Sequence, residues 1–228
     1  MKKAAKLKKF IVYLALVLVF LPVKTNAQET VDKMVATISD SVNTELITYS
    51  DVLWQLALQP GASLNPPTSD ELNRALQLLI NQRLFALEAQ RLPRAEPSAD
   101  EIKAKIEDVL AGFPSTAEFE KRLRLVGFDS VKDENFERMM AQRVRIEKYI
   151  DFRFRSFVVI TPDDEAKYYR ETFIPEFRRR NPGLLMPGLE EKRAEIRQIL
   201  TEQKVFAEIQ RFLDESKARA EIVVLSEV

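Results

Sequence analysis

The sequence predicts a mainly α-helical protein, a multi-helix bundle with a small β-sheet that joins the N-terminal and C-terminal ends of the chain. Two observations lead to this prediction. Several segments with helical spacing begin at a Ser or Thr that an acidic residue follows three positions later, which is typical of a capped helix. The isolated β-prone segments lie near the two ends, at 31–38 and 222–225, and such short strands are stable only when paired.

The first 27 residues have the organisation of a secretory signal peptide. Lysines within residues 2–9 precede the uninterrupted apolar run Phe10–Leu21, and a small residue, Ala27, offers a cleavage site. An apolar run of this length makes a helix of about 18 Å, shorter than the roughly 30 Å hydrocarbon core of a bilayer. We therefore expect export to the periplasm, cleavage after Ala27 and no stable membrane anchor.

The mature chain is predicted to open with a strand, a turn and a second short strand. Residues 31–38 alternate between apolar and polar, residues 39–41 are polar, and residues 46–47 are apolar again. Thr48 and Asp51 have the spacing of a capping box and begin a short helix, whose core includes Trp54, the only tryptophan.

Four helices make up the rest of the predicted bundle. The helix from Thr68 to about Leu92 is apolar on almost all sides, and such a helix belongs in the middle of a bundle. Shorter helices between capping residues and glycines favour antiparallel packing of neighbours. These helices are expected over residues 98–112, 115–127 and 131–154.

A hinge, a helix and a linker are predicted to follow. Residues 157–160 are extended, and Thr161-Pro162 begins a helix with proline at its first position, which fades at 173–175. The Pro- and Arg-rich residues 174–188 are interpreted as a linker. Their run Arg178–Arg180 is interpreted as solvated, with contact to an acidic client as the alternative.

A long amphipathic helix is predicted from Leu189 to about Lys217. Its buried face is expected to carry Ile196, Ile199, Leu200, Phe206, Ile209 and Leu213. The chain thus divides into a signal peptide (1–27), an N-terminal helical domain (28–173), a linker (174–188) and a C-terminal helix and strand that pack back on that domain (189–228).

The composition excludes most catalytic chemistry. The chain has no histidine and no cysteine, so zinc sites, Ser-His-Asp triads and Cys-His pairs are excluded. The five glycines form no phosphate-binding loop. The carboxylates occur in patterns typical of solvated helix faces, as in Glu190-Glu191. We therefore expect a protein that is not an enzyme and needs no cofactor or metal.

The charge of the mature chain is negative. Residues 1–27 hold six of the 35 basic residues and none of the 35 acidic ones, so 29 basic and 35 acidic residues remain, a net charge of −6. Nucleic acids and anionic membranes bind basic surfaces, so this balance argues against both as partners.

The layout resembles the SurA family of periplasmic chaperones. The resembling segments are Val31–Ile38 with Ile47–Val52, the central helix Glu71–Leu92, the hinge Ile160–Glu165, and Leu189–Leu225 as the returning helix and strand. The resemblance implies a chaperone core of the SurA or trigger-factor type, which holds unfolded outer-membrane or other exported proteins without ATP.

The chain departs from the family at the prolyl isomerase module. In the family, one or more parvulin domains of roughly 100 residues separate the hinge helix from the C-terminal helix, and a segment as short as residues 175–188 cannot bury such a core. The parvulin site also uses histidine, which this chain lacks. The resemblance therefore implies the chaperone core without its isomerase.

An apolar groove between bundle helices is expected to bind extended, aromatic-rich client segments. Aromatic residues and methionines are the candidates, since methionine adapts to varied partners; at helical spacing they are also typical of a core. The candidate client-binding residues are Phe113, Phe119, Phe128, Phe136, Met139, Met140 and Phe177.

Three rival hypotheses remain. The main one is an envelope scaffold or assembly subunit with one dedicated partner, whose interface would be flatter and fixed by polar pairs. A prolyl isomerase is disfavoured by the missing domain, and a trimeric helical-tentacle holdase by the negative charge and the absence of a second long helix. The clients and the oligomeric state, a homodimer included, are left open.

Overall fold

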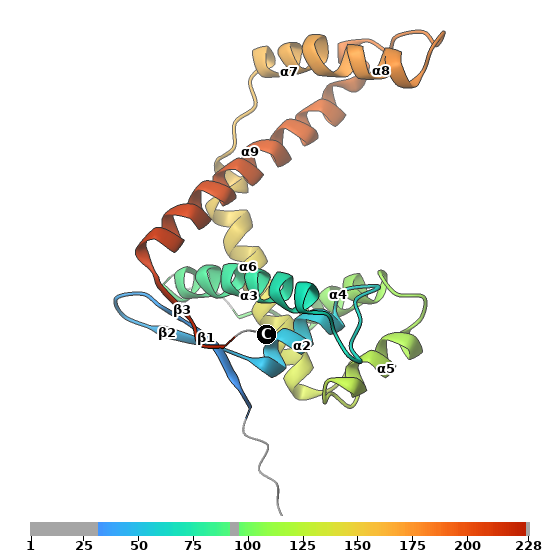
Figure 1. Cartoon of the computed structure of the whole chain (residues 1–228). Coiled ribbons are helices and arrows are strands. Elements are labelled where there is room, and N and C mark those ends of the chain that lie inside the picture. Colours follow the sequence, from blue (N-terminus) through green and yellow to red (C-terminus); the bar gives the residue numbers. More distant parts are fainter. Residues whose placement is uncertain (1–31, 92–95, 227–228) are drawn as a thin grey trace, which may run out of the picture. The chain divides into compact units, whose positions relative to one another are not determined.

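The computed structural model describes residues 32–91 and 96–226, and the predicted signal peptide lies outside them. The described chain is mainly helical and carries a small antiparallel sheet (Figure 1). The predicted fold class is confirmed in both respects.

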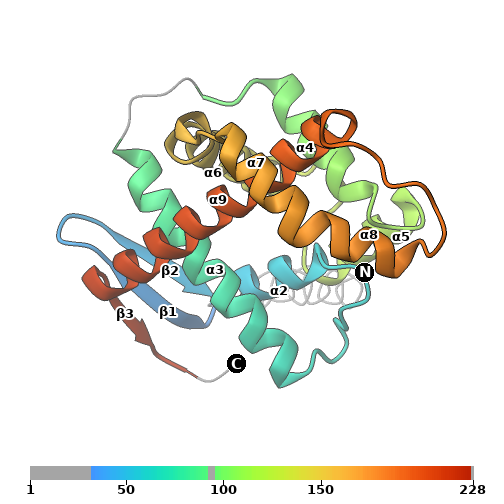
Figure 2. The same cartoon turned by 90° about the horizontal axis from the view of Figure 1, so that it is seen from above.

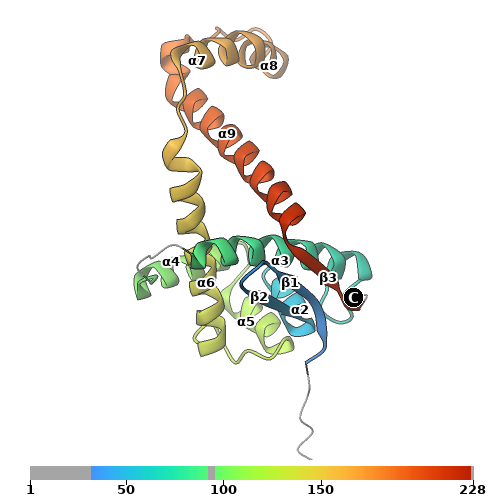
Figure 3. The same ribbon diagram turned by 90° about the vertical axis from the view of Figure 1, so that its left-hand side faces the viewer.

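The sheet has the strand order β2-β1-β3. Strand β1 (Met34–Ser39) pairs antiparallel with β2 (Thr44–Thr48) on one edge and with β3 (Glu221–Val224) on the other. The register places Ile38 opposite Ile222, and Ile38 is fully buried. Segments from near the start and the end of the described chain therefore share one sheet, and β3 follows directly from the last long helix (Figure 3).

Side-chain caps begin most of the helices, as their sequences predict. Thr48, Thr68, Ser98 and Thr161 each form a complete capping box with the acidic residue three positions later. These boxes begin α2 (Tyr49–Ala57), α3 (Ser69–Gln90), α4 (Ala99–Leu110) and α7 (Pro162–Tyr168).

Two further helices begin at simpler caps. Ser115 accepts the Glu118 N–H at the start of α5 (Thr116–Leu125), and Asp133 begins α6 (Glu134–Arg153). The glycine expected to close α5 does so: Gly127 has a φ of +94°, and the next N–H donates to the Leu123 carbonyl at 3.0 Å. This hydrogen bond and the positive φ are those of a Schellman C-cap.

Helix α3 lies in the middle of the structure. It contacts α2, α6 and α9 (Leu189–Arg219) as well as β1 and β2, and Figure 2 shows α9 crossing it. Its central position confirms the interpretation of its apolar sequence, although Leu78 is 45% exposed. Helices and strands cover α3 on several sides but leave a strip that includes Leu78.

The core consists of two clusters. The larger one joins the inner face of the sheet to α2, α3, the end of α6 and α9; in it Phe85 of α3 stacks on Phe212 of α9 with ring centroids 5.0 Å apart. The smaller one lies between α5 and α6. Trp54 packs against the smaller cluster, with its ring centroid 4.9 Å from that of Phe128. Its indole N–H donates to the Val126 carbonyl at 2.9 Å.

The region predicted as a linker begins as a helix. After α7, the π-helical turn η2 (Tyr169–Phe173) leads without a break into α8 (Ile174–Arg180), so the predicted helix end at 173–175 is wrong and the first residues of the predicted linker are helical. The wider π turn directly precedes Pro175, whose missing N–H would interrupt a regular α-helix. Only residues 181–188 connect α8 to α9 without helix.

Helix α9 packs through the predicted face except at Phe206, and Ile199, Leu200 and Ile209 of that face are half-buried. Ile196 and Leu213 are buried as expected, but Phe206 is 63% exposed and Val205 is buried in its place. Successive helical residues differ by about 100° around the axis, so these two cannot face the same neighbour. Phe206 is thus a surface residue.

Candidate functional site

Four of the seven predicted client-binding residues are buried. Phe119, Phe136 and Met140 are fully buried and Phe128 is 2% exposed, all in the smaller core cluster. The Phe136 ring lies 5.9 Å from that of Phe119 and 5.6 Å from that of Phe128. These four residues hold α5 against α6 and are not accessible at the surface of this structure.

The other three predicted residues are half-buried and lie apart. Phe113 and Met139 pack on the edge of the smaller cluster, and the Arg122 guanidinium lies 5.8 Å from the centre of the Phe113 ring. Phe177 lies on α8, where its ring stacks on Phe173 at 5.8 Å. The structure therefore does not bring the seven residues together into one surface.

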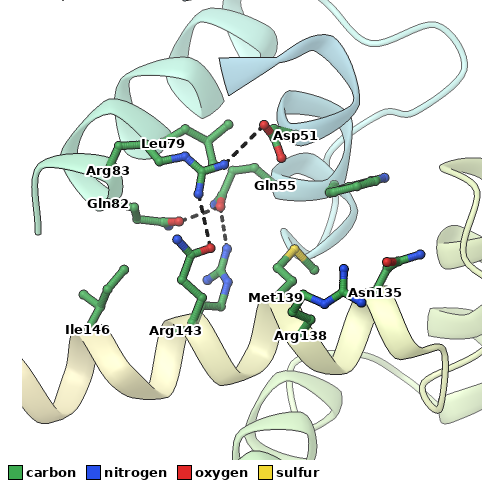
Figure 4. A pocket seen from close by; sticks show the side chains of 12 residues that line it. Asp51, Gln55, Leu79, Gln82, Arg83, Asn135, Arg138, Met139, Arg143 and Ile146 are labelled. Atoms are coloured by element: carbon green, nitrogen blue, oxygen red, sulfur yellow. Dashed lines mark hydrogen bonds and ion pairs between the residues drawn. The ribbon is translucent and has the colours of Figure 1, made fainter. Parts of the chain in front are cut away.

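A polar pocket of about 190 Å3 lies between α2, α3 and α6 (Figure 4). Arg83 of α3 reaches across it: its Nη2 donates to the Asp51 carboxylate at 3.2 Å, and its Nη1 donates to the Gln142 side chain at 3.2 Å. The Asp51 carboxylate also accepts the Thr48 N–H in the capping box of α2, so it both stabilises the start of this helix and holds the Arg83 guanidinium.

Gln55 is the centre of the same pocket. Its side-chain oxygen accepts hydrogen bonds from Gln82 at 3.2 Å and from Nη2 of Arg143, which rises from α6 on the opposite side (Figure 4). Burial lowers the pKa of the Arg143 guanidinium. The groups gathered here can donate hydrogen bonds to an anion, but they include no nucleophile paired with a base.

A second candidate surface lies where α6 ends and the chain passes to α7. A cavity of about 400 Å3 there is lined by the end of α6, the short 3-10 helix η1 (Arg155–Phe157), the extended residues 158–159 and α9. At this junction surface, Phe157 is 69% exposed and Val159 is 71% exposed. Phe152 adds a third exposed apolar side chain, with its ring 6.1 Å from that of Phe157.

Ion pairs hold the junction surface in place. Arg155 donates to Glu202 of α9 at 3.1 Å and to Asp151 of α6 at 3.0 Å. Lys204 of α9 donates to the Val159 carbonyl at 2.9 Å and to Asp164 at 3.0 Å. The extended segment is therefore fixed to α9 through its backbone, while its apolar side chains stay exposed.

The carboxylates of these ion pairs have lowered pKa values. The Thr161 N–H and the Lys204 ammonium lower the pKa of Asp164 to about 2, and the hydrogen bond from Arg155 lowers the pKa of Glu202. Both groups stay ionised at neutral pH. They position the junction surface and are not poised to transfer protons.

The sequence had predicted residues 157–160 as an extended hinge but did not single them out as a binding site. The available signal was the β-prone run Phe157–Ile160, for which the sequence offers no partner strand. Apolar residues with no pairing strand must either enter the core or remain exposed, and here Phe157 and Val159 remain exposed.

Two classes of site are not found among residues 32–91 and 96–226. No group of three or more Asp and Glu side chains in this part of the chain is arranged to hold a metal ion. None of its helices is long and apolar enough to cross a bilayer.

Comparison with known proteins adds no relative. No protein-family model matches the chain, and no curated protein sequence matches it.

Proposed function

We propose that the protein is an ATP-independent periplasmic holdase, a SurA-like chaperone core without an isomerase domain, which binds unfolded, aromatic-rich segments of outer-membrane proteins. The observation that carries this proposal is the junction surface. Phe157 and Val159 are exposed at the edge of a cavity, on a segment whose backbone is already held by Lys204, and the exposed Phe152 of α6 lies next to Phe157.

The chemistry of this surface suits extended clients of varied sequence. Exposed aliphatic and aromatic side chains gain free energy when they are removed from water, whatever the detailed sequence of the client. The nearby charges of Arg155 and Glu202 are paired with each other, so they impose no single partner charge. The junction surface thus replaces the predicted groove residues as the proposed client contact.

Suppression of aggregation tests the proposal. The mature protein should keep a denatured outer-membrane β-barrel protein soluble after dilution from urea, at a near-stoichiometric ratio and without nucleotide, as measured by light scattering. The effect should survive moderate salt, because exposed charges are screened beyond about 8–10 Å whereas apolar contacts are not. The cis/trans rate of a proline test peptide should not change.

The double variant Phe157→Ser with Val159→Ser should weaken client binding by at least about tenfold, since fully burying one such apolar side chain contributes about 1.5–3 kcal/mol and about 1.4 kcal/mol is tenfold in affinity. The matched control is Val42→Ser with Leu125→Ser, which removes two exposed residues away from the junction surface, Val42 (78% exposed) between β1 and β2 and Leu125 (62% exposed) at the end of α5. If the wild-type protein does not hold client even at several-fold excess, the proposal fails, and a scaffold with one dedicated partner becomes the better hypothesis.

A further inference from the structure

The charges that line the polar pocket do not balance. Arg83, Arg138 and Arg143 line it, but Asp51 is its one lining carboxylate. Arg83 pairs with Asp51, and Arg138 pairs with Glu134 at 2.9 Å. Arg143 forms no ion pair with the described residues; its Nη2 donates to the neutral Gln55, and its buried Nε has no hydrogen-bond partner among them.

The carboxylate of the same helix that attracts Arg143 is already engaged. Glu147 lies one helical turn beyond Arg143, and its carboxylate pairs with Lys105 of α4. The Arg143 side chain is half-buried with its Nε fully buried, and removing a cation from water without a counter-ion is unfavourable. The guanidinium of Arg143 therefore favours the arrival of an anion.

The rest of the pocket indicates which anion fits. Trp54, Leu79, Met139 and Ile146 give it apolar walls, while Asn135 and Arg138 lie exposed at its edge. Asp51 would repel an anion of high charge, whereas a single negative charge would balance the single unpaired arginine. The cavity of about 190 Å3 has room for a group no larger than one amino-acid residue.

We propose that this pocket binds a carboxylate attached to a small apolar group, with the carboxylate on the guanidinium of Arg143 and the apolar group between Trp54 and Met139. The planar guanidinium of arginine matches the geometry of a carboxylate, with two parallel N–H donors. This site is separate from the junction surface, so it does not depend on the proposed holdase function.

Thermal unfolding with matched probes tests the site. N-acetylphenylalanine carries a carboxylate and should raise the melting temperature of the protein in a saturable manner, because a ligand that binds only the folded state stabilises it. N-acetylphenylalaninamide has the same ring without the charge and should have no effect. Equal shifts from both probes, or from sodium chloride at the same ionic strength, would overturn the proposal.

Two variants leave the pocket without an unpaired positive charge. Arg143→Met deletes the guanidinium, and Gln55→Glu adds a carboxylate within the pocket that can pair with it. Both should raise the melting temperature of the ligand-free protein and weaken binding of N-acetylphenylalanine about tenfold or more, since the charge-assisted hydrogen bonds are lost. Gln55→Glu keeps the arginine, so it remains informative if Arg143→Met does not fold.

The matched control is Arg145→Met, which removes a half-buried arginine of the same helix that pairs with Glu96. It should leave binding of the probe unchanged. Wild-type affinity in both Arg143→Met and Gln55→Glu would refute the site.

A short peptide that ends in phenylalanine identifies the source of the carboxylate. If the peptide binds more tightly than N-acetylphenylalanine, and C-terminal amidation abolishes its binding, the natural ligand is the C-terminus of a polypeptide. If the peptide binds more weakly than N-acetylphenylalanine, the natural ligand is a small free acid.

Discussion

Glu165 is a buried carboxylate, 1% exposed, where α7 packs on α9. Arg197 holds it with Nη2 at 2.6 Å and Nε at 2.8 Å, and the Nε of Arg193 lies 3.2 Å away. The Arg193 contact is an ion pair without the geometry of a hydrogen bond. Two half-exposed arginines thus compensate one buried charge, and the position of α7 depends on them.

Glu165→Ala should therefore destabilise the protein by about 2 kcal/mol. Loss of one partner of a buried ion pair costs roughly 3–5 kcal/mol, and the partial exposure of both arginines lets water offset part of that cost. Denaturant unfolding measures the change. The control Glu190→Ala removes a 78% exposed partner of Arg193 and should lower the free energy of unfolding by less than about 0.5 kcal/mol. Equal effects of the two variants would contradict this role of Glu165.

Phe136 shows how a predicted contact residue acts in the core. It is fully buried between Phe119 and Phe128, so Phe136→Ala should lower the free energy of unfolding by about 3–5 kcal/mol. Leu125→Ala, at a 62% exposed position of the neighbouring helix, should change it by less than about 0.5 kcal/mol. A stable Phe136→Ala protein with lost client binding would instead support the original interpretation.

The helix caps make the stability of individual elements depend on pH. The N–H groups of Thr68 and Ser63 lower the pKa of Glu71 from 4.5 to about 2. A carboxyl group whose pKa is lowered by folding stabilises the protein above its unfolded pKa, and this contribution is lost as the pH falls through the folded pKa. The contribution of Glu71 should therefore be complete above about pH 4.5 and fade toward pH 2.

Glu71→Gln tests this cap. The amide cannot ionise, so the melting temperature of the variant should fall less steeply between pH 5 and pH 2 than that of the wild type, while being lower at neutral pH. The exposed Glu134, at the start of α6, provides the control substitution Glu134→Gln. Wild-type acid dependence in Glu71→Gln would show that the cap does not contribute.

Strand β3 stabilises the sheet from its outer edge. Deletion of residues 219–228 removes the partner of β1 and should destabilise β1, β2 and the helices packed beneath them, because an isolated two-stranded hairpin is only marginally stable. Hydrogen exchange should become faster than in the wild type at Thr37, which lies opposite Val223 of β3. Unchanged exchange and helicity in the truncated protein would refute this dependence.

The same elements show what the sequence could predict. Caps and turns depend on neighbouring residues, so Thr48, Thr68 and Ser98 could be assigned to helix starts from spacing alone. The buried face of α9 depends on its distant partners in α3, which the helical period does not identify, and Phe206 was placed on the wrong side. The helix beyond Phe173 was missed because a π turn accommodates Pro175, and no local signal marks such a turn.

The candidate site was less predictable than the fold. Apolar character marks both core and binding residues, and only the packed structure separates buried Phe136 from exposed Phe157. The unpaired charge of Arg143 likewise emerges only when α2, α3 and α6 come together. What the sequence did establish is that the chain holds no site built on histidine or cysteine.

On the scale of the whole molecule, the proposed function requires that unfolded client contacts the junction surface and not the rest of the apolar surface. The absence of native cysteine makes this requirement directly testable, because single cysteines can be introduced without background reaction. Phe157→Cys and Val159→Cys place the thiol at the junction surface. Val42→Cys and Leu125→Cys place it at exposed apolar positions elsewhere.

The most direct measurement is crosslinking of these four variants, carrying a cysteine-linked photocrosslinker, to an unfolded outer-membrane β-barrel protein. The holdase proposal predicts client crosslinks from positions 157 and 159, few from positions 42 and 125, and loss of all of them once the client has folded. Equal crosslinking from all four positions, or crosslinking only from positions 42 and 125, would contradict the assignment of client binding to the junction surface.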